Sequence, residues 1–209
     1  MIILSHRGYW KDIKERNQRE AFIRSFDLGY GTETDLRDIC GKIVISHDMP
    51  TGNEITFEDL LKIMNGRNLP LALNIKADGL SDAIKELLDK YSHTNYFTFD
   101  MSIPDQVVQI KKGLNVFTGY SDILSKPVLL NESEGVWLDC FNSDWYKQDL
   151  IDNLINNGKK VCVVSADLHK RDVAYQWKIL SKCMSINSNN LFICTDYPEK
   201  AKEYFNDKD

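Results

Sequence analysis

The sequence predicts an α/β fold of parallel strands alternating with helices, and three observations point to that class. Short, nearly continuous apolar runs recur along the chain, which is typical of parallel strands covered on both faces. Segments with the helical spacing of apolar residues separate most of these runs. No linker or shift in composition divides the 209 residues, so we expect one domain over residues 1–209.

The predicted strands are apolar runs that end at turn residues or at polar clusters. The first is a short run at residues 2–4, and the second carries the polar pattern of residues 31–36. A short strand at 43–45 follows a turn at Gly41. The remaining strands are expected over residues 69–77, 96–101, 116–120, 135–141, 160–165 and 191–195.

Helices are predicted where apolar residues share one face beside a start or stop signal. In the first, residues 18–28, Phe22 and Phe26 share a face and Gly29 ends the helix. Thr56 is expected to cap the next helix by accepting a hydrogen bond from its first turn. The later helices are expected over residues 56–64, 81–91, 104–112, 148–156, 171–183 and 199–205.

This alternation predicts a TIM-type (β/α)₈ barrel, because about eight strand-to-helix units follow one another without a break. An open doubly wound sheet is the alternative, but no glycine-rich phosphate loop follows the first strand. The chain is short for a barrel, so one unit is expected to be degenerate. Residues 121–134, which are irregular, are the expected place.

Composition and charge exclude several classes of partner. The formal net charge is −5, so no basic field attracts nucleic acid or an anionic membrane. The apolar run near the N-terminus is too short for a signal peptide, and no later stretch is long enough to span a membrane. The five cysteines form no CxxC pair and are expected to be reduced thiols. These features predict a cytoplasmic protein without stable membrane insertion.

Polar side chains follow or occupy the ends of successive predicted strands. In a (β/α) barrel the carboxyl ends of the strands form one face, and that face carries the active site. Residues two apart on a strand point to the same side, so each of the spaced pairs shares a face. The residues expected at this face are His6, Arg7, Glu33, Asp35, His47, Asp48, Asn74 and Lys76.

These residue types suit the binding of a metal and a phosphate. The oxygens of Glu33, Asp35 and Asn74 are the hard ligands that Mg²⁺ or Ca²⁺ prefers, so we expect one divalent cation there. Arg7 and Lys76 supply the local positive charge that a phosphate ester requires. The prediction is therefore a metal-dependent site for a small phosphodiester.

The two histidines, His6 and His47, are predicted to be the acid–base pair. Imidazoles titrate near neutral pH, so one can take a proton from the attacking hydroxyl while the other donates one to the leaving oxygen. The sequence leaves open which histidine plays which role. It also leaves open whether water attacks or an internal hydroxyl of the substrate attacks and gives a cyclic phosphate.

The motifs lie in a fixed order along nearly the whole chain. They are His6-Arg7-Gly8, Asn17 with Ala21-Phe22, Glu33-Thr34-Asp35, His47-Asp48, Asn74 with Lys76, and Thr195-Asp196 with Pro198. This ordered set resembles the glycerophosphodiester phosphodiesterase family, within the phosphatidylinositol-phospholipase-C-like barrel superfamily. The resemblance implies a TIM barrel, a divalent cation and hydrolysis of a phosphodiester.

Three features depart from that family's pattern. Arg16 stands where the family has a glutamate, and Asn74 stands where it has a third acidic ligand. The amide leaves the site one negative charge poorer, which predicts weaker metal binding or a substrate phosphate as an additional anionic ligand. The connection from Asp48 to Thr56 is short, which predicts a more open mouth and a substrate other than plain glycerophosphodiesters.

Residues 73–79, 99–102 and 165–169 resemble a short, divergent bacterial branch associated with surface-polysaccharide genes. That resemblance implies a phosphodiester in a surface-polysaccharide or nucleotide-linked precursor. His169 follows the predicted strand at 160–165 and Trp137 lies in the predicted strand at 135–141, so both are predicted to contact the substrate.

Two other functions stay open on the sequence alone. One is a phosphate-ligand-binding protein without turnover, which Asn74 in place of an acid would favour. The other is a lyase or phospholipase D-type enzyme acting on phospholipid, which the absence of a basic amphipathic helix disfavours.

Overall fold

The computed structural model describes residues 1–206, which form two compact units. The N-terminal unit contains residues Ser5–Val116. The C-terminal unit contains Met1–Leu4 and the described residues from Phe117 onward. The first strand, β1 (Ile2–His6), contributes its first half to one unit and its second half to the other. The prediction of a single domain stays a prediction.

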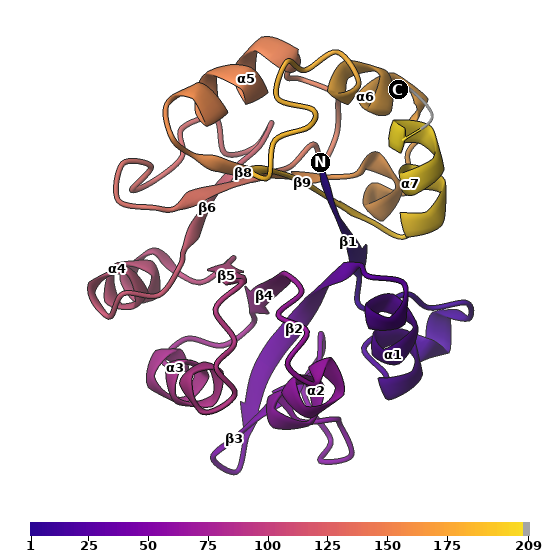
Figure 1. Ribbon diagram of the computed structural model, residues 1–209. Helices are drawn as coiled ribbons and strands as arrows, with labels where there is room; N and C mark the ends of the chain where they lie inside the picture. The colour runs from indigo at the N-terminus through magenta and orange to yellow at the C-terminus, as the bar shows by residue number, and fades with distance from the viewer. Residues whose placement is uncertain (207–209) are drawn as a thin grey trace. The chain divides into compact units, whose positions relative to one another are not determined.

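In the N-terminal unit, parallel strands alternate with helices (Figure 1). Its strands are hydrogen-bonded in the order β5-β4-β2-β1, and β3 lies off this path as an antiparallel partner of β2. After β1, the elements are η1 (Ile13–Glu15), α1 (Arg19–Asp27), β2 (Gly31–Ile39), β3 (Lys42–Ile45), α2 (Phe57–Met64), β4 (Leu71–Ile75), α3 (Ser81–Lys90), β5 (Tyr96–Phe99) and α4 (Ile103–Lys111).

In the C-terminal unit the strand order is β6-β7-β8-β9-β1. The predicted degenerate unit is confirmed, because no helix separates β6 from β7 over residues 121–134, all of which the structure describes. The elements are β6 (Phe117–Tyr120), β7 (Gly135–Leu138), α5 (Gln148–Asn156), β8 (Lys160–Val164), η2 (Ala166–His169), α6 (Ala174–Leu180), β9 (Leu191–Thr195) and α7 (Pro198–Asn206).

The predicted fold class, a (β/α)₈ barrel, is confirmed. One strand order runs through β1, β5-β4-β2-β1-β9-β8-β7-β6, with eight parallel strands and seven α-helices among the described residues. The short strand at 43–45 is not one of the eight, because β3 forms a hairpin with the outer end of β2. The helix predicted over 171–183 is shorter than expected, because Lys170 adopts a left-handed conformation and Asp172 accepts a hydrogen bond from the backbone N–H of Ala174.

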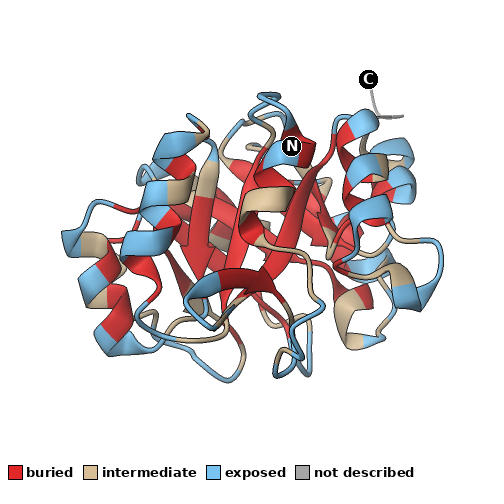
Figure 2. Cartoon of the chain, turned by 90° about the horizontal axis from the view of Figure 1, so that it is seen from below, coloured by how far each residue is buried: buried red, intermediate tan, exposed pale blue. Residues whose placement is uncertain are grey.

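The two faces of the strands in the N-terminal unit differ in character. Leu71, Leu73 and Ile75 pack with residues of α1, α2 and α3 in one apolar core, so these side chains face the helices. The alternate residues of β4, Ala72 and Asn74, therefore lie on the opposite face. Figure 2 shows the strands as buried and the helices as exposed on their outer sides. The polar residues of the strands thus occupy a face that the apolar core does not use.

Two further findings concern the composition. Among the described residues, no helix is both long enough and apolar enough to cross a membrane. All five cysteines are free thiols, of which four are buried. Cys40 is exposed in the tight turn between β2 and β3.

Candidate functional site

The centre of the candidate site is a pair of carboxylates on β2. Leu36 belongs to the apolar core beside the helices, so Glu33 and Asp35, at odd offsets from it, lie on the other face of the strand. The parallel register aligns Asp35 with Asn74 of β4. All three predicted metal ligands therefore lie on one face of two neighbouring strands, as the sequence predicted.

Asp35 is fully buried and is surrounded by donors. Arg7 Nε lies 3.0 Å from Asp35 Oδ2, and Lys76 Nζ lies 3.4 Å from Asp35 Oδ1. Asn17 Nδ2 donates a hydrogen bond of 2.9 Å to Asp35 Oδ2. The two predicted phosphate-binding cations are thus held beside a carboxylate, with their side chains 19% and 21% exposed. Each therefore keeps a surface that a ligand can reach.

Glu33 is almost fully buried, and its pKa is raised well above the ordinary value. Loss of hydration is the largest cause, and the neighbouring charge of Asp35 adds to it. The positive charges of Arg7 and Lys76 oppose the shift. His6 Nε2 lies 3.9 Å from Glu33 Oε2, which places one predicted acid–base residue beside the predicted metal ligands. Like-charged carboxyls, two cationic side chains and His6 therefore lie close together in this cluster.

Asn74 contacts a residue from the next strand. Its Nδ2 donates a hydrogen bond of 3.2 Å to Asp100 Oδ2, and Asp100 follows directly after the end of β5. The charge of Asp100 also contributes to raising the pKa of Glu33. Asp100 is thus part of the same cluster.

Backbone geometry at the end of β1 positions Arg7. Arg7 and Asn17 both adopt left-handed conformations, with φ of 58° and 59°. The Asn17 backbone N–H donates to the carbonyl of Arg7, and the Arg7 N–H donates to the carbonyl of Glu33. Gly8 has φ +80°, and a Cβ added there would lie 2.7 Å from the Cβ of Ala21. Only glycine fits at this point, where the chain passes closely over α1.

Asn17 is the functional residue whose role the sequence did not reveal. It joins two strand residues, because its Oδ1 accepts from Thr34 Oγ1 at 2.9 Å while its Nδ2 donates to Asp35. An amide can donate and accept at once, which an acidic residue cannot do when ionised. The signal was present in the motif order, but the spacing of 18 residues from Asp35 gave no indication of contact.

His47 reaches the site along the hairpin formed by β2 and β3. The backbone N–H of Ser46 donates to the carbonyl of Asp35 at 3.0 Å, so the residue that precedes His47 is bonded to the centre of the cluster. The His47 imidazole is half-exposed, and its Nδ1 lies 3.0 Å from Asp48 Oδ1. His47 is therefore near the cluster along the backbone, but it is far more open to solvent than His6.

The buried oxygens of this cluster fit a divalent cation. Glu33 Oε2, Asp35 Oδ1 and Asn74 Oδ1 are each buried without a hydrogen-bond partner. Two of these oxygens have a cationic neighbour, Lys76 Nζ at 3.4 Å from Asp35 Oδ1 and His6 Nε2 at 3.9 Å from Glu33 Oε2. Since buried polar atoms are nearly always hydrogen-bonded, the three oxygens are suited to the coordination of a cation. No cluster of three His, Cys, Asp or Glu side chains suited to a metal occurs within residues 1–206. This is consistent with a set whose third oxygen belongs to an amide.

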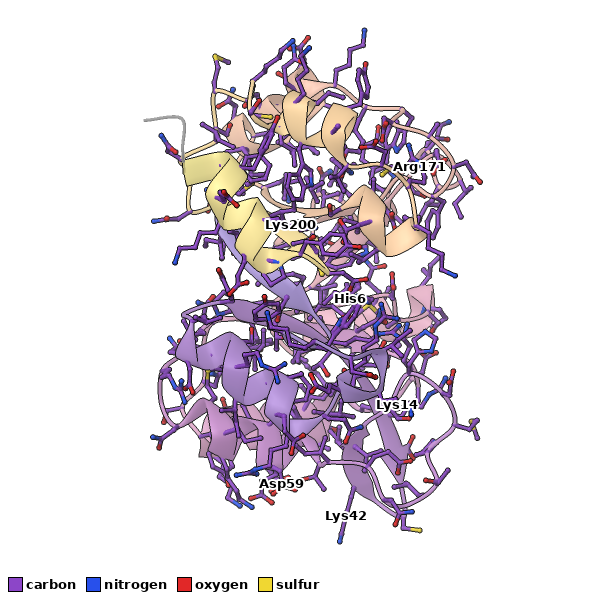
Figure 3. All side chains as sticks on the ribbon, turned by 90° about the vertical axis from the view of Figure 1, so that its right-hand side faces the viewer. His6, Lys14, Lys42, Asp59, Arg171 and Lys200 are labelled. Atoms are coloured by element: carbon purple, nitrogen blue, oxygen red, sulfur yellow. The ribbon has the colours of Figure 1, made fainter. Side chains whose placement is uncertain are left out.

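The surface hollow lined by Lys42, Glu58 and Asp59 is a separate feature of the N-terminal unit. Figure 3 shows Lys42 and Asp59 at the far end of this unit from His6. Glu58 is already paired with Lys90 at 2.7 Å, and Asp59 is hydrogen-bonded to Thr56. Both acidic side chains therefore already have partners, so this hollow is a weaker candidate site than the buried cluster.

The remaining predicted contacts, Trp137 and His169, belong to the C-terminal unit. Trp137 lies on β7 and is buried, with 6% of its surface exposed. His169 Nε2 lies 2.6 Å from Asp139 Oδ1, and this hydrogen bond raises the pKa of the imidazole. The pair follows the ends of β7 and β8. Their contact with a substrate stays a prediction.

The closing motif of the chain also has a structural role. Asp167 accepts hydrogen bonds from Thr195 Oγ1 at 3.0 Å and from the Asp196 backbone N–H at 2.7 Å. Thr195 Oγ1 in turn accepts from the backbone N–H of Tyr197. The threonine and aspartate of the motif thus hold the turn after β9 to the segment after β8.

The fold and the cluster together define a (β/α) barrel protein with buried oxygen ligands, cationic side chains and a histidine at the ends of its strands. No family model matches the sequence, and no curated protein matches it either. Solved structures do match it.

Three solved structures share the fold over nearly the whole chain. A glycerophosphodiester phosphodiesterase from Agrobacterium tumefaciens has a TM-score of 0.72 and 15% identity, and the match covers 98% of each chain. A phosphodiesterase from Oleispira antarctica, in complex with the product sn-glycerol-3-phosphate, has a TM-score of 0.68, 14% identity and coverage of 99% and 97%. A glycerophosphoryl diester phosphodiesterase from Parabacteroides distasonis has a TM-score of 0.65, 15% identity and coverage of 99% and 86%. The chain therefore has the fold of the glycerophosphodiester phosphodiesterases.

Proposed function

We propose that this protein is a divalent-metal-dependent phosphodiesterase that hydrolyses a small phosphodiester. The observation that carries the proposal is the set of three buried oxygens without a hydrogen-bond partner, on Glu33, Asp35 and Asn74. Two cationic side chains and a histidine lie beside them. The fold is also that of solved phosphodiesterases, one of which is bound to sn-glycerol-3-phosphate.

The three oxygens would hold Mg²⁺ or Ca²⁺, since both cations prefer hard oxygen ligands. When bound, the cation would neutralise a non-bridging oxygen of the phosphodiester. Arg7 and Lys76 bind the other non-bridging oxygen through the parts of their side chains that are exposed. Asp35 fixes both cationic side chains in place, so the phosphate meets a preorganised pair of donors.

His6 and His47 carry the protons of the reaction. One imidazole takes a proton from the attacking water as the new phosphorus–oxygen bond forms. The other donates a proton to the leaving alkoxide as the ester bond breaks, which gives a phosphomonoester and an alcohol. His6, whose side chain is 13% exposed, is the residue beside the metal ligands, and the half-exposed His47 can exchange protons with solvent.

The substrate class that we propose is a glycerophosphodiester-like compound or a nucleotide-linked or surface-polysaccharide precursor. The Asp48–Thr56 connection is short and contains no helix or strand, and we infer from this that the side of the site near His47 is open. An open site fits a leaving group larger than a simple alcohol.

The test is a hydrolysis screen of glycerophosphodiesters, nucleotide diphosphate adducts and polysaccharide fragments with Mg²⁺, Ca²⁺ or EDTA. Phosphorus NMR identifies the product, because a phosphomonoester indicates attack by water and a cyclic phosphate indicates attack by an internal hydroxyl. Turnover that needs a cation and is lost in His6→Ala supports the proposal. Binding of phosphate esters without turnover on any substrate would instead favour the phosphate-binding alternative, for which the missing third acid at Asn74 is the specific observation.

A further inference from the structure

The three proposed ligand oxygens differ in chemistry. Two of them belong to carboxylates and one belongs to an amide. The amide of Asn74 has two ends of similar shape, and only the oxygen end can bind a cation. Something must therefore fix which end points into the site.

Asp100 provides that constraint. Its Oδ2 accepts the hydrogen bond from Asn74 Nδ2 at 3.2 Å. An ionised carboxylate only accepts hydrogen bonds, so the NH₂ group is the only end of the amide that can face it. Asn74 Oδ1 is then directed away from Asp100, and this atom is the one that is buried without a partner.

The backbone places Asp100 for this contact. The register aligns Asn74 with Phe99, the last residue of β5, so Asp100 is the first residue beyond the aligned pair. Asp100 adopts a left-handed conformation with φ of 64°, which turns the chain sharply at this residue. Aspartate is among the few non-glycine residues that tolerate this conformation. The side chain therefore turns toward Asn74.

Asp100 also supplies the negative charge that the amide lacks. Its charge acts on Glu33, a buried carboxyl of the ligand set. A cation held by the same oxygens would experience the same field. The negative charge that a third acidic ligand would carry thus belongs to Asp100, which follows β5, the strand next to β4.

We infer that Asp100 is a positioning residue for the cation site, which orients the Asn74 amide with its oxygen toward the cation and provides the third negative charge from behind it. This inference rests on the metal site of the proposed function. On this inference the pair Asn74–Asp100 replaces a single acidic ligand. The neutral Asn74 oxygen binds the cation, and Asp100 supplies the negative charge.

The test measures cation affinity rather than catalysis. Isothermal titration of Ca²⁺ and Mg²⁺ into the full chain, without substrate, compares wild type with Asp100→Asn and with a matched control, Asp89→Asn. Asp89 is an exposed acid on α3 of the same unit. Loss of an outer-shell partner typically costs about 10–100-fold in metal affinity, so Asp100→Asn should weaken binding by about that factor and Asp89→Asn should not.

An exchange of the two side chains separates orientation and charge from a general structural effect. In Asn74→Asp with Asp100→Asn, the carboxylate enters the site and the amide supports it from behind. This double variant should bind the cation at least as tightly as wild type, although each position is altered. Thermal unfolding in EDTA confirms that each variant is folded.

The outcomes distinguish the two proposals. If wild type binds the cation and Asp100→Asn binds it equally well, the role of Asp100 is wrong while the metal site stands. If the exchange variant binds as weakly as Asp100→Asn, the pair does not act as a divided ligand. If wild type binds no cation at millimolar concentration, the metal site itself fails, and the inference about Asp100 fails with it.

Discussion

Replacing Glu33 by glutamine should stabilise the metal-free protein while abolishing its metal binding. Glu33 is buried, one of its oxygens has no hydrogen-bond partner, and the charge of Asp35 repels it. Glutamine has nearly the same shape and removes the charge. Its NH₂ group can also donate to an acceptor such as Asp35 Oδ1, which has no hydrogen-bond partner in the structure.

The magnitude follows from the balance of charges around Glu33. Burying one ionised carboxylate costs several kcal/mol in lost hydration. Arg7 and Lys76 partly offset that cost, so removing the charge recovers only part of it, about 1–2 kcal/mol. For a chain of 209 residues, each kcal/mol shifts the melting temperature by about 2–4 °C. We therefore expect Glu33→Gln to melt about 2–8 °C above wild type in EDTA.

The pH dependence sharpens this test. A carboxyl with a raised pKa holds its proton more tightly in the folded state, so the stability of wild type falls as pH rises from the ordinary pKa of 4.5 toward the folded value. Glu33→Gln lacks this loss, so its advantage should grow with pH and shrink in acid. Differential scanning calorimetry in EDTA measures both variants, with Glu86→Gln on the exposed side of α3 as control. A lower melting temperature for Glu33→Gln would show that the carboxylate is not an electrostatic burden.

The other predictions concern catalysis, packing and the pKa of His169. His6→Ala and His47→Ala should each lower turnover by about 10²–10⁴-fold without unfolding the protein, and a near-normal rate on the true substrate would contradict the acid–base assignment. Gly8→Ala should destabilise by about 2–4 kcal/mol in urea unfolding, because its Cβ meets Ala21 and φ is positive. Gly29→Ala, with φ +78° and nothing within 4 Å, should cost only about 1–2 kcal/mol, and equal effects would show that the close approach is unimportant. Asp139→Asn should lower the pKa of His169, which NMR titration of the imidazole measures. The raised pKa stabilises the fold fully below the ordinary value of 6.5 and less as pH rises through the folded value, so the difference in stability between Asp139→Asn and wild type should be largest in acid.

The sequence was sufficient to predict the fold because its signals are local. Alternating apolar runs and helical faces need only neighbouring residues, and Thr56 caps α2 by accepting from Asp59 as expected. The convergence of Glu33, Asp35 and Asn74 followed from the geometry of parallel strands. The predicted face of these side chains depends on the alternation of each strand, which the sequence displays directly.

The residues that the sequence did not explain act across long separations or through the backbone. Asn17 bonds Asp35 across 18 residues, and Asn74 bonds Asp100 across 26. These contacts depend on where loops turn, which local patterns do not specify. The hairpin of β2 and β3 was also not foreseen, since a short apolar run such as 43–45 carries no sign of its direction. The ion pairs from Arg7 and Lys76 to Asp35 likewise required the register of β2 and β4.

Three residues of the cluster, Arg7, Asn17 and Asp100, adopt left-handed backbone conformations that L-amino acids rarely choose. A designer who copied only the side chains of this cluster onto another barrel would therefore fail to reproduce it. The recipient loops would have to bend in the same unusual way, and ordinary loops would aim the guanidinium and both polar groups elsewhere. The transferable unit is the bent loop together with its residue, so engineering this chemistry into a new scaffold means transplanting segments of main chain.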